Sequence, residues 1–446
     1  MKLFDTLKNI WKIDELKNRI LMTLGLILVY RLGTEVVLPG IDPAGLAALK
    51  KQTSTGVLGL LDMFSGGAFS NASIFALGIM PYISASIVVQ LLGIAVPYFQ
   101  RMQREGESGR RKINQITRYL TIVILILQGS AYLTNLHAQI QPEFFVIKGF
   151  FFTLQSVAIL AAGSMFVLWL GEKITDKGIG NGVSIIIMIG IIARLPFAFV
   201  AELTSRVGQQ GGGLVALLIE IVFLFLVFCG TILLVQGTRK VPVQYAKRIV
   251  GNKQYGGVRQ YIPLKINAAG VMPIIFAQAI MLLPISFANY AAADSMTGFI
   301  AAFSNMTGFW YNFTFFVLIV AFTYFYTAIT VNPMQMSEDM KKNGGFIPGV
   351  KPGRKTMEFL DTIMSRITLP GSIFLGIVAI LPAFAMLSGV NNQFAHFYGG
   401  TSLLILVGVV LDTLQQIESH LLMRHYDGLM KNGRIKGKTP GGPAAY

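Results

Sequence analysis

The sequence predicts an all-α polytopic membrane protein with ten transmembrane helices arranged as two inverted halves of five. Composition is the first observation behind this fold class, because 53% of the 446 residues are apolar and only 13% are charged. The mean hydropathy is +0.61, and a soluble core of this length cannot bury so much apolar surface. A bilayer is therefore the expected solvent. The other two observations are the number of apolar blocks and the placement of positive charge.

Ten blocks are long and apolar enough to be spans. A spanning helix needs about 20 mainly apolar residues, since only a helix or a closed barrel satisfies its own backbone hydrogen bonds in lipid. The blocks cover residues 20–38, 72–96, 119–136, 150–170, 183–200, 214–235, 268–293, 309–331, 367–387 and 399–411, the last with a polar extension. A Gly-rich break at residues 211–213 divides them into five and five.

The lysines and arginines indicate the orientation of these spans. With the N-terminus in the cytosol, 31 of the 37 lie in the N-terminal segment, the alternate loops and the C-terminal tail, and five lie in the opposite loops. Cytosolic loops carry such an excess, so both termini are expected in the cytoplasm. Five spans in each half make the halves inverted, and inverted repeats commonly place a transport pathway at their interface.

The predicted organisation is an N-terminal half at residues 1–210, a C-terminal half at 211–423 and a cytosolic tail at 424–446. Two long basic loops, at about 237–266 and 332–366, belong to the second half. The net charge of +16 would suggest nucleic acid in a soluble protein. Here the charges cluster between apolar blocks, and membrane lipids and cytosolic partners are the expected counterparts.

Few residues suggest catalysis, and we expect no enzymatic activity, no metal and no cofactor. The single cysteine, Cys229, cannot form an internal disulfide or a Cys-rich metal site. Ionisable residues inside spans are functional candidates by default, and they are Arg31, Glu35, Arg194, Glu220 and Asp412. The first two are four residues apart on one helix face and predict a structural pair, while Arg194 and Asp412 lie near span ends where they can snorkel.

Residues 58–71, reading LGLLDMFSGGAFSN, precede the second block on the outer side. The segment is too short and too rich in glycine to cross a bilayer. It is either a short re-entrant element buried in protein or an outer loop on the surface, and composition leaves both open.

The second block contains GIMPYISAS, in which Ile79 and Ile83 share a helix face and Pro81 is expected to kink the helix. Aliphatic residues facing a passage can gate it by dewetting, but the same spacing also suits ordinary packing. Further on, GIGNG at residues 178–182 lacks the strand and the acidic residue of a dinucleotide site. It predicts flexible backbone opening the fifth span, with Asn181 at its entry.

The basic loops admit two interpretations. Residues 237–265 carry seven cations and no acid, and the loop around Lys351 adds six more. A topology signal explains this charge fully. Their length, their aromatic, proline and glycine content and their shared face favour a docking surface for RNA or an acidic partner.

Long irregular strings resemble the bacterial SecY family over essentially the whole chain. They read MFSGGAFSNASIFALGIMPYISASIVVQLL, EGESGRRKINQITRY, GEKITDKGIGNGVSIII, INAAGVMPIIFAQAIMLLP and FYGGTSLLILVGVVLD. The resemblance implies a channel of two five-helix halves around a central hourglass pore, with a short plug helix and a seam that opens to lipid. It also settles segment 58–71 in favour of the plug.

The resemblance assigns residues to each part of this channel. The pore ring maps onto Ile79, Ile83, Val183, Ile187, Ile275 and Ile405, with Val183 at a position where isoleucine is usual in some relatives. The plug maps onto Leu60, Leu61, Met63, Phe64, Ser65, Gly66 and Gly67. A polar cluster at the lateral gate maps onto Ser84, Gln128 and Asn267, which are expected to hydrogen-bond one another when the gate is shut.

Docking of cytosolic partners is implied for Arg239, Lys240, Lys247, Arg248, Lys351 and Arg354. Lys351 replaces an arginine that is common in the family, and the two are not equivalent where a planar fork binds carboxylate or phosphate. By hypothesis, Arg354 supplies the guanidinium that is missing at position 351.

The implied function is a passive protein-conducting channel of the bacterial cytoplasmic membrane that passes unfolded preproteins across and transmembrane segments sideways. SecE and SecG are the implied membrane partners, with SecA or the ribosome as the driving partner, preprotein signal sequences as ligands, and SecD, SecF and YidC as further possible associates. The chain carries no Walker motif, so it is not the motor. A secondary transporter is the competing hypothesis, and it predicts a polar or charged site at the midplane, where this sequence places aliphatic residues.

Overall fold

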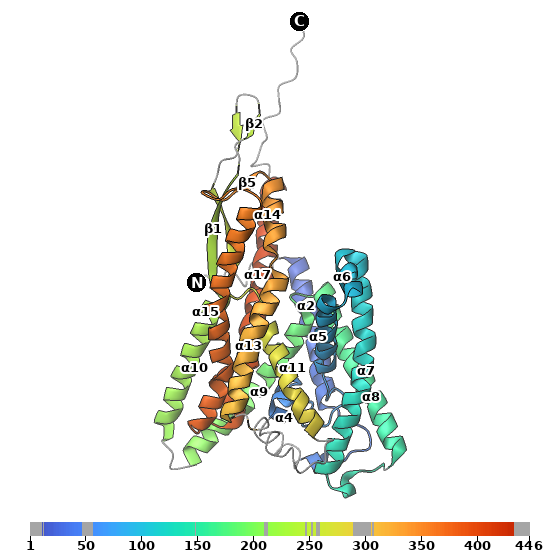
Figure 1. Cartoon of the computed structure of the whole chain (residues 1–446). Coiled ribbons are helices and arrows are strands. Elements are labelled where there is room, and N and C mark those ends of the chain that lie inside the picture. Colours follow the sequence, from blue (N-terminus) through green and yellow to red (C-terminus); the bar gives the residue numbers. More distant parts are fainter. Residues whose placement is uncertain are drawn as a thin grey trace.

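The computed structural model describes residue 11 and residues 13–46, 57–147, 149–208, 213–245, 248–250, 253–255, 259–288, 305 and 307–431. Long helices lie side by side through most of this region (Figure 1). A helix occupies each of the ten predicted blocks: α2 (Asp14–Glu35), α5 (Met80–Ala95), α7 (Glu107–Gln139), α8 (Phe150–Lys177), α9 (Gly182–Gly208), α10 (Gly213–Gln236), α11 (Met272–Ala288), α13 (Phe309–Thr330), α15 (Arg354–Leu387) and α17 (Gly400–Lys431).

Seven of the described helices are long and apolar enough to span a membrane. An eighth span results if α5 and the following α6 (Pro97–Arg104), which meet at a bend of 100°, are counted together. Of the remaining two, α11 has 17 described residues, and α2 begins with a charged turn containing Asp14 and Glu15. Each predicted block therefore contains a helix, although α2 and α11 are not among the helices that are long and apolar enough to span a membrane.

The second predicted block starts eight residues too early. Residues 72–79 form buried turns, and helix α5 begins only at Met80. Gly78 has φ +52°, a left-handed conformation that glycine adopts without a steric penalty. Pro81 lies in the first turn of α5, where its missing N–H removes no helical hydrogen bond. The expected kink at Pro81 is therefore wrong, because the proline starts the helix.

Several helices extend past the apolar blocks into the predicted loops. Helix α7 starts at Glu107, twelve residues before the third block, and α15 starts at Arg354, thirteen residues before the ninth. The helices therefore continue through polar residues that precede the apolar blocks. Two further helices, α14 (Pro333–Lys342) and α16 (Asn392–Ala395), lie in connections, as do the 3-10 turns η1 (Pro43–Gly45) and η2 (Pro142–Phe144).

The two halves bury separate cores and share a third. One core contains Leu38, Tyr132 and Phe152 of the first half, and another contains Ile274, Ile319 and Leu375 of the second. The third core contains residues from both halves, including Ile79 and Ile405. Figure 1 shows α5, α7 and α8 on one side of the molecule and α10, α13 and α15 on the other. The shared core therefore joins the halves.

A small sheet, which the all-helical prediction did not include, joins the two basic loops. Strand β1 (Thr238–Tyr245) pairs antiparallel with β4 (Arg259–Lys265), with Thr238 opposite Lys265. Strand β5 (Gly345–Phe346) adds to the other edge of β1, giving the order β4-β1-β5. Strands β2 (Arg248–Val250) and β3 (Lys253–Tyr255) form a separate hairpin. The sheet lies beside the ends of α14 and α15, and the hairpin of β2 projects beyond the helices (Figure 1).

Candidate pore and plug

The six predicted ring residues meet in one apolar cluster, hereafter the collar. They come from four places in the chain: Ile79 and Ile83 at the start of α5, Val183 and Ile187 in the first turns of α9, Ile275 on α11 and Ile405 on α17. Ile79, Ile187 and Ile405 are at most 5% exposed, and the other three are partly buried against them. Segments as distant as residues 79 and 405 therefore contribute to one apolar surface between the halves.

The glycines of the GIGNG segment position α9 within the collar. An added Cβ at Gly182 would lie 1.9 Å from the carbonyl oxygen of Gly171 on α8, so only glycine allows this approach. The Asn181 side chain accepts a hydrogen bond from the Ser184 backbone N–H at 3.3 Å, as expected at a helix start. The prediction that this segment opens the fifth span is confirmed, and the close packing of α8 on α9 places Val183 and Ile187 at the collar.

The predicted plug begins as a short helix, α4 (Val57–Phe64), and continues as buried turns. Met63 and Phe64 belong to the same apolar cluster as the collar, and Leu61 packs against the core of the first half. Leu60 lies within α4. Gly66 and Gly67 have φ of +67° and +97°, which turn the chain directly after the helix. The plug is therefore in contact with the collar from one side.

Glycine also permits the close approach of the plug to α9. An added Cβ at Gly190 would lie 2.7 Å from the Phe64 carbonyl oxygen and 3.1 Å from the Gly66 nitrogen. Ile187, on the preceding turn of α9, lies in the collar, so the plug and the collar share one helix face.

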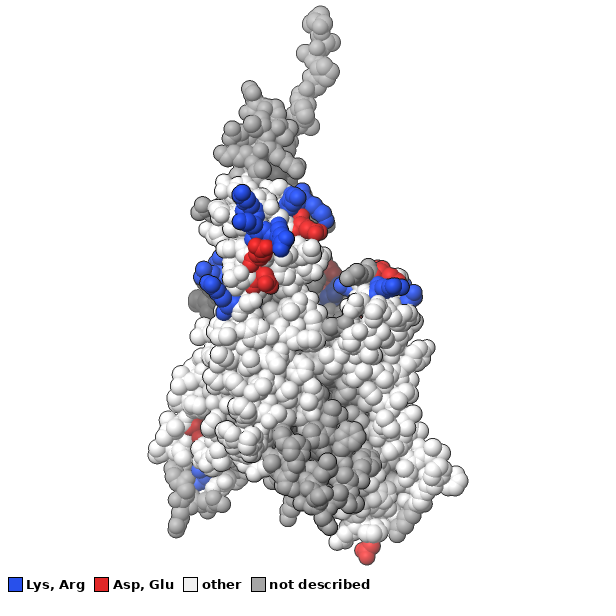
Figure 2. Space-filling view, viewed as in Figure 1, with Lys and Arg blue, Asp and Glu red and all other residues white. Residues whose placement is uncertain are grey.

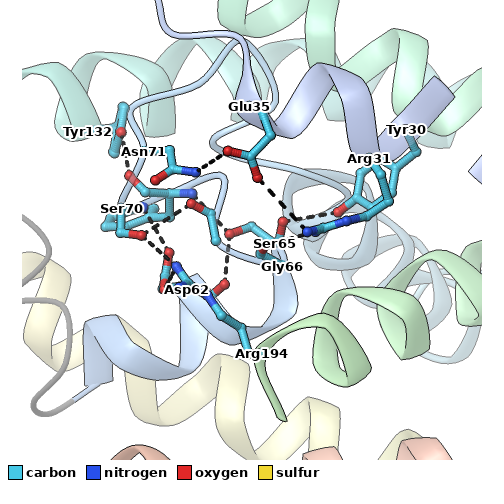
Figure 3. A network of polar contacts seen from close by, with 12 residues as sticks. Tyr30, Arg31, Glu35, Asp62, Ser65, Gly66, Ser70, Asn71, Tyr132 and Arg194 are labelled. Carbon is cyan, nitrogen blue, oxygen red and sulfur yellow. Dashed lines mark hydrogen bonds and ion pairs between the residues drawn. The ribbon is translucent and has the colours of Figure 1, made fainter. Parts of the chain in front are cut away.

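Polar side chains from three helices hold the plug, as Figure 3 shows. Arg194 of α9 forms an ion pair with Asp62 at 2.5 Å and donates to the Ser70 hydroxyl at 2.6 Å. Asp62 also accepts from the Ser70 backbone N–H at 2.8 Å. These contacts close a loop between α4, the following turns and α9. Arg194, which was predicted to lie near a span end where it can snorkel, directs its partly exposed guanidinium to the plug.

Other contacts fix the turns that follow α4. The Tyr30 hydroxyl donates to the Ser65 carbonyl at 3.1 Å, and the Arg31 guanidinium donates to the Gly66 carbonyl at 2.9 Å. Tyr132 of α7 donates to the Phe69 carbonyl at 2.9 Å. The predicted structural pair of Arg31 with Glu35 is confirmed at 4.0 Å.

Sequence reasoning missed Asp62, Tyr30 and Tyr132 in this network. The only local signal was a carboxylate within an otherwise apolar, glycine-rich segment.

The predicted gate residues do not form the hydrogen bonds expected between them. Ser84 of α5 donates to the Met80 carbonyl of its own helix at 3.1 Å. Asn267, just before α11, is 7% exposed, and its side-chain oxygen has no hydrogen-bond partner. Gln128 lies half-buried on α7. Among the described residues, Ser84, Gln128 and Asn267 make no hydrogen bond to one another, so their role at a lateral gate stays a prediction.

Comparison with known proteins supports one family. The family model described as SecY matches residues 73–414, which include all six collar residues. Protein translocase subunit SecY of Streptomyces coelicolor is 42% identical over 439 residues, covering 94% of this chain and 98% of that protein. The same subunit of Mycobacterium tuberculosis is 40% identical over 435 residues, covering 94% and 97%.

This chain belongs to the SecY family.

Solved structures show the same fold. A protein-conducting channel matches with a TM-score of 0.61 at 17% identity, covering 90% of this chain and 92% of that one. Sec61 from a canine ribosome–channel complex matches with a TM-score of 0.57, also at 17% identity and with the same coverage. This chain therefore shares its overall fold with these channels.

Exposed cations of both basic loops of this SecY-family chain gather at one end of the molecule, with exposed carboxylates among them, and are hereafter called the cationic surface. Arg239 and Lys240 are exposed on β1, and Lys351 and Arg354 are exposed where the chain leaves β5 and enters α15. Arg354 also pairs with Glu358 on its own helix. The pairing of β5 with β1 connects the two loops, and Figure 2 shows lysines and arginines gathered at this end of the molecule. Arg248 starts β2, and Lys247 lies outside the described residues.

Proposed function

We propose that the chain is the channel-forming subunit of a bacterial protein translocase, which conducts unfolded polypeptides across the cytoplasmic membrane. The collar carries this proposal, because six aliphatic side chains from four helices meet between two halves of a membrane protein and contact the plug. The family relatives are protein translocase subunits, and the matching structures are protein-conducting channels. Both observations support a pathway for polypeptide through the collar.

Aliphatic side chains suit this task for two physical reasons. A narrow apolar constriction excludes water and therefore blocks hydrated ions when no chain occupies it. The same side chains form no strong directional bonds, so an extended polypeptide of any sequence can slide past them. A transporter of small solutes needs polar groups that recognise its substrate, and the collar offers none among its six members. The competing transporter hypothesis therefore finds less support.

The polar contacts of the plug stabilise a closed state of the channel, and these contacts must break before transport. Opening the channel separates Asp62 from Arg194 and exposes the backbone carbonyls that Tyr30 and Arg31 now bind. These polar contacts lie beside the collar, so a polypeptide entering the collar would displace Met63 and Phe64 first. A closed state held by several weak contacts can be shifted by a few kcal/mol of binding energy from the entering chain.

A lateral exit is proposed at the boundary of α5 and α7 with α11 and α13, where Ser84, Gln128 and Asn267 lie. Ser84 bonds within its own helix, and the Asn267 side-chain oxygen has no partner. Separating these helices would therefore break no side-chain hydrogen bond between the three residues. The apolar helix of a signal sequence or a transmembrane segment would fill the opening and pass from there into lipid.

Partners are proposed from the surfaces that the chain presents. The cationic surface on β1 and the start of α15 suits an acidic protein or ribosomal RNA, and Sec61 and Ssh1 relatives of this fold occur in ribosome complexes. We assign SecA and the ribosome to this surface, and SecE and SecG to the membrane-embedded surface. The cationic end then faces the cytosol, both termini are cytosolic, and the halves divide near residues 209–212, between α9 and α10.

The test of this proposal is a pair of collar substitutions. Asparagine at Ile275 or Ile405 would hydrate the collar and weaken its contact with Phe64, so both variants should leak ions at rest and export preproteins with defective signal sequences. Ion conductance is measured in planar bilayers, and export is measured in cells. The matched control is Leu154→Asn on α8, where the side chain is 56% exposed on the outside of the bundle. Equal conductance and export in all three variants would refute the collar.

A further inference from the structure

The end of α9 and the beginning of α10 hold a buried group of two carboxylates and one guanidinium, hereafter the junction cluster. Arg206 and Glu202 of α9 pair at 2.8 Å, and Arg206 also pairs with Glu220 of α10. The side chains of Glu202, Glu220 and Arg206 are 0%, 11% and 14% exposed, respectively. Such burial is unusual for ionised groups, because removing a charge from water is costly unless it is fully compensated.

The junction cluster also contacts the second half through the connection between α15 and α16. The backbone N–H of Asn391 donates to the second carboxylate oxygen of Glu202 at 2.7 Å, and Arg206 donates to the Gly389 carbonyl at 2.9 Å. The cluster therefore links the last helix of the first half, the first helix of the second half and a distant connection of that second half. A change in its charge changes the contact between the halves.

The charges of this cluster do not balance. Two ionised carboxylates and one guanidinium leave one uncompensated negative charge in a buried place. One oxygen of Glu220, Oε2, is buried without a hydrogen-bond partner, and so is the hydroxyl of Tyr398, a residue only 2% exposed. The Tyr398 ring stacks at 6.0 Å on Phe223, which lies one helical turn from Glu220. Two orphaned polar atoms thus lie in the same buried region as the unbalanced charge.

A proton accounts for these observations together. Adding one to a carboxylate oxygen raises the net charge of the cluster from minus one to zero and creates an O–H donor. The Tyr398 phenol does not supply this proton, because burial and then the Glu220 and Glu202 charges raise its pKa. Arginine does not supply it either, since guanidinium stays protonated in proteins. The proton comes from the solution at this end of the molecule.

We propose that the junction cluster is a proton-binding site in which Glu220, whose Oε2 has no hydrogen-bond partner, holds one proton while the halves are closed. Opening the junction to water lets Glu220 ionise and releases the proton. Proton binding stands on the cluster itself. Two further statements rest on the proposed function: that the proton affects the channel, and that the junction cluster lies on the outer side of the membrane.

The sign of the pH dependence follows from this difference in proton number. Above the ordinary carboxyl pKa of about 4.3, the closed state binds one more proton than the open or unfolded state. Stability is therefore present at lower pH and is lost as the pH rises and the closed cluster releases its proton. His396, in the connection before α17, acts in the opposite sense. Burial lowers its pKa to about 4, so it removes stability as the pH falls below about 6.5.

The experiment compares the full chain with Glu220→Gln, which keeps the shape of the carboxyl and carries no charge. Infrared difference spectra of the wild type, recorded between about pH 5 and pH 9, should contain the carbonyl band of a protonated carboxylic acid that disappears as pH rises. The band should be missing in Glu220→Gln. The melting temperature of the wild type should fall over the alkaline part of this range, and that of the variant should stay level.

The matched control is Glu143→Gln, which removes an exposed carboxylate in η2, remote in sequence from the junction cluster. This variant should keep both the band and the pH dependence of the wild type. Absence of any Glu220-dependent band, or the same pH dependence in Glu220→Gln and the wild type, would overturn the proposal. So would a melting temperature set by sodium concentration at constant pH, because the site would then bind a metal cation. Normal protein export in Glu220→Gln, together with the expected loss of the band and of the pH dependence, would count against the link to the proposed function alone.

Discussion

Arg194 has two partners in the plug segment, the carboxylate of Asp62 and the hydroxyl of Ser70. The Asp62 side chain is 12% exposed and that of Arg194 is 29% exposed, so water screens the pair only in part. Loss of the guanidinium leaves a nearly buried carboxylate without its charge partner. Leaving a buried polar group unsatisfied costs about 1–3 kcal/mol, and the same amount is available to shift the plug from its closed position.

We predict that Arg194→Met increases resting ion conductance by roughly tenfold, since about 1.4 kcal/mol corresponds to a factor of ten in an equilibrium. Single-channel recording in planar bilayers measures this change. In a background of Asp62→Asn the further effect of Arg194→Met should be smaller, because the two residues act on the plug as a pair.

The matched control for this pair is Arg118→Met. Arg118 of α7 binds Glu172 of α8 at 2.6 Å, away from the plug, so its loss should leave the resting conductance at the wild-type level. Independent, additive effects of Asp62→Asn and Arg194→Met would show that the ion pair does not hold the plug.

At the scale of elements, the sheet formed by β4, β1 and β5 holds the two basic loops in a fixed arrangement. A three-stranded sheet with Val241, Val243 and Leu264 packed on Met340 and other apolar residues is a rigid support. It fixes the exposed cations of β1 relative to those at the start of α15. Positive charges held in a fixed pattern give a partner both long-range attraction and a defined orientation. Free loops would give attraction alone.

We predict that Arg239→Glu combined with Lys351→Glu weakens the binding of SecA and of ribosomes to membranes that contain the channel. The fold should be retained, because both side chains are exposed and exposed charges contribute little to stability. Binding is measured at several salt concentrations, and the variant should show both lower affinity and a shallower salt dependence. Lys112→Glu, a charge reversal at another exposed position on α7, is the control. An unchanged affinity and salt dependence would reduce the surface to a topology signal.

At the scale of the whole molecule, the collar lies where the two halves share a core, and the junction cluster lies where the chain passes from one half to the other. The collar and the junction cluster are therefore two places at which the halves contact each other. The side-chain hydrogen bonds and the ion pair that Tyr30, Tyr132 and Arg194 make with the plug come from α2, α7 and α9 of the first half, whereas its apolar contacts in the collar involve both halves.

The proposed orientation predicts which surfaces an impermeant thiol reagent reaches in intact cells. In a Cys229→Ser background, single cysteines are placed at Lys240, Lys351 and Glu143, all exposed in the structure. Only Glu143→Cys should be labelled, because the cationic end lies in the cytosol. Labelling of all three after the cells are permeabilised is the control. Labelling of Lys240→Cys or Lys351→Cys in intact cells would reverse the topology.

The sequence by itself determined the membrane-spanning elements, because lipid exposure requires long apolar runs whatever the neighbouring helices do. For α8, α10 and α13 the predicted blocks begin within one residue of the helices. The six collar residues were assigned through family resemblance, and the structure brings them together. The start of α5 was misplaced, since hydropathy does not distinguish buried turns from buried helix.

Only the tertiary structure decided how the polar groups are used. Asp62 and Arg194 are 132 positions apart in the chain, and Glu202 and Asn391 are 189 apart. Neither pair has a local periodicity or motif, because each depends on how whole helices pack. The sheet likewise needed the pairing of β1 with β5 across about a hundred residues of chain. The apolar pattern of one segment indicates whether that segment is buried. A polar contact depends on two segments, and only the folded chain brings those two together.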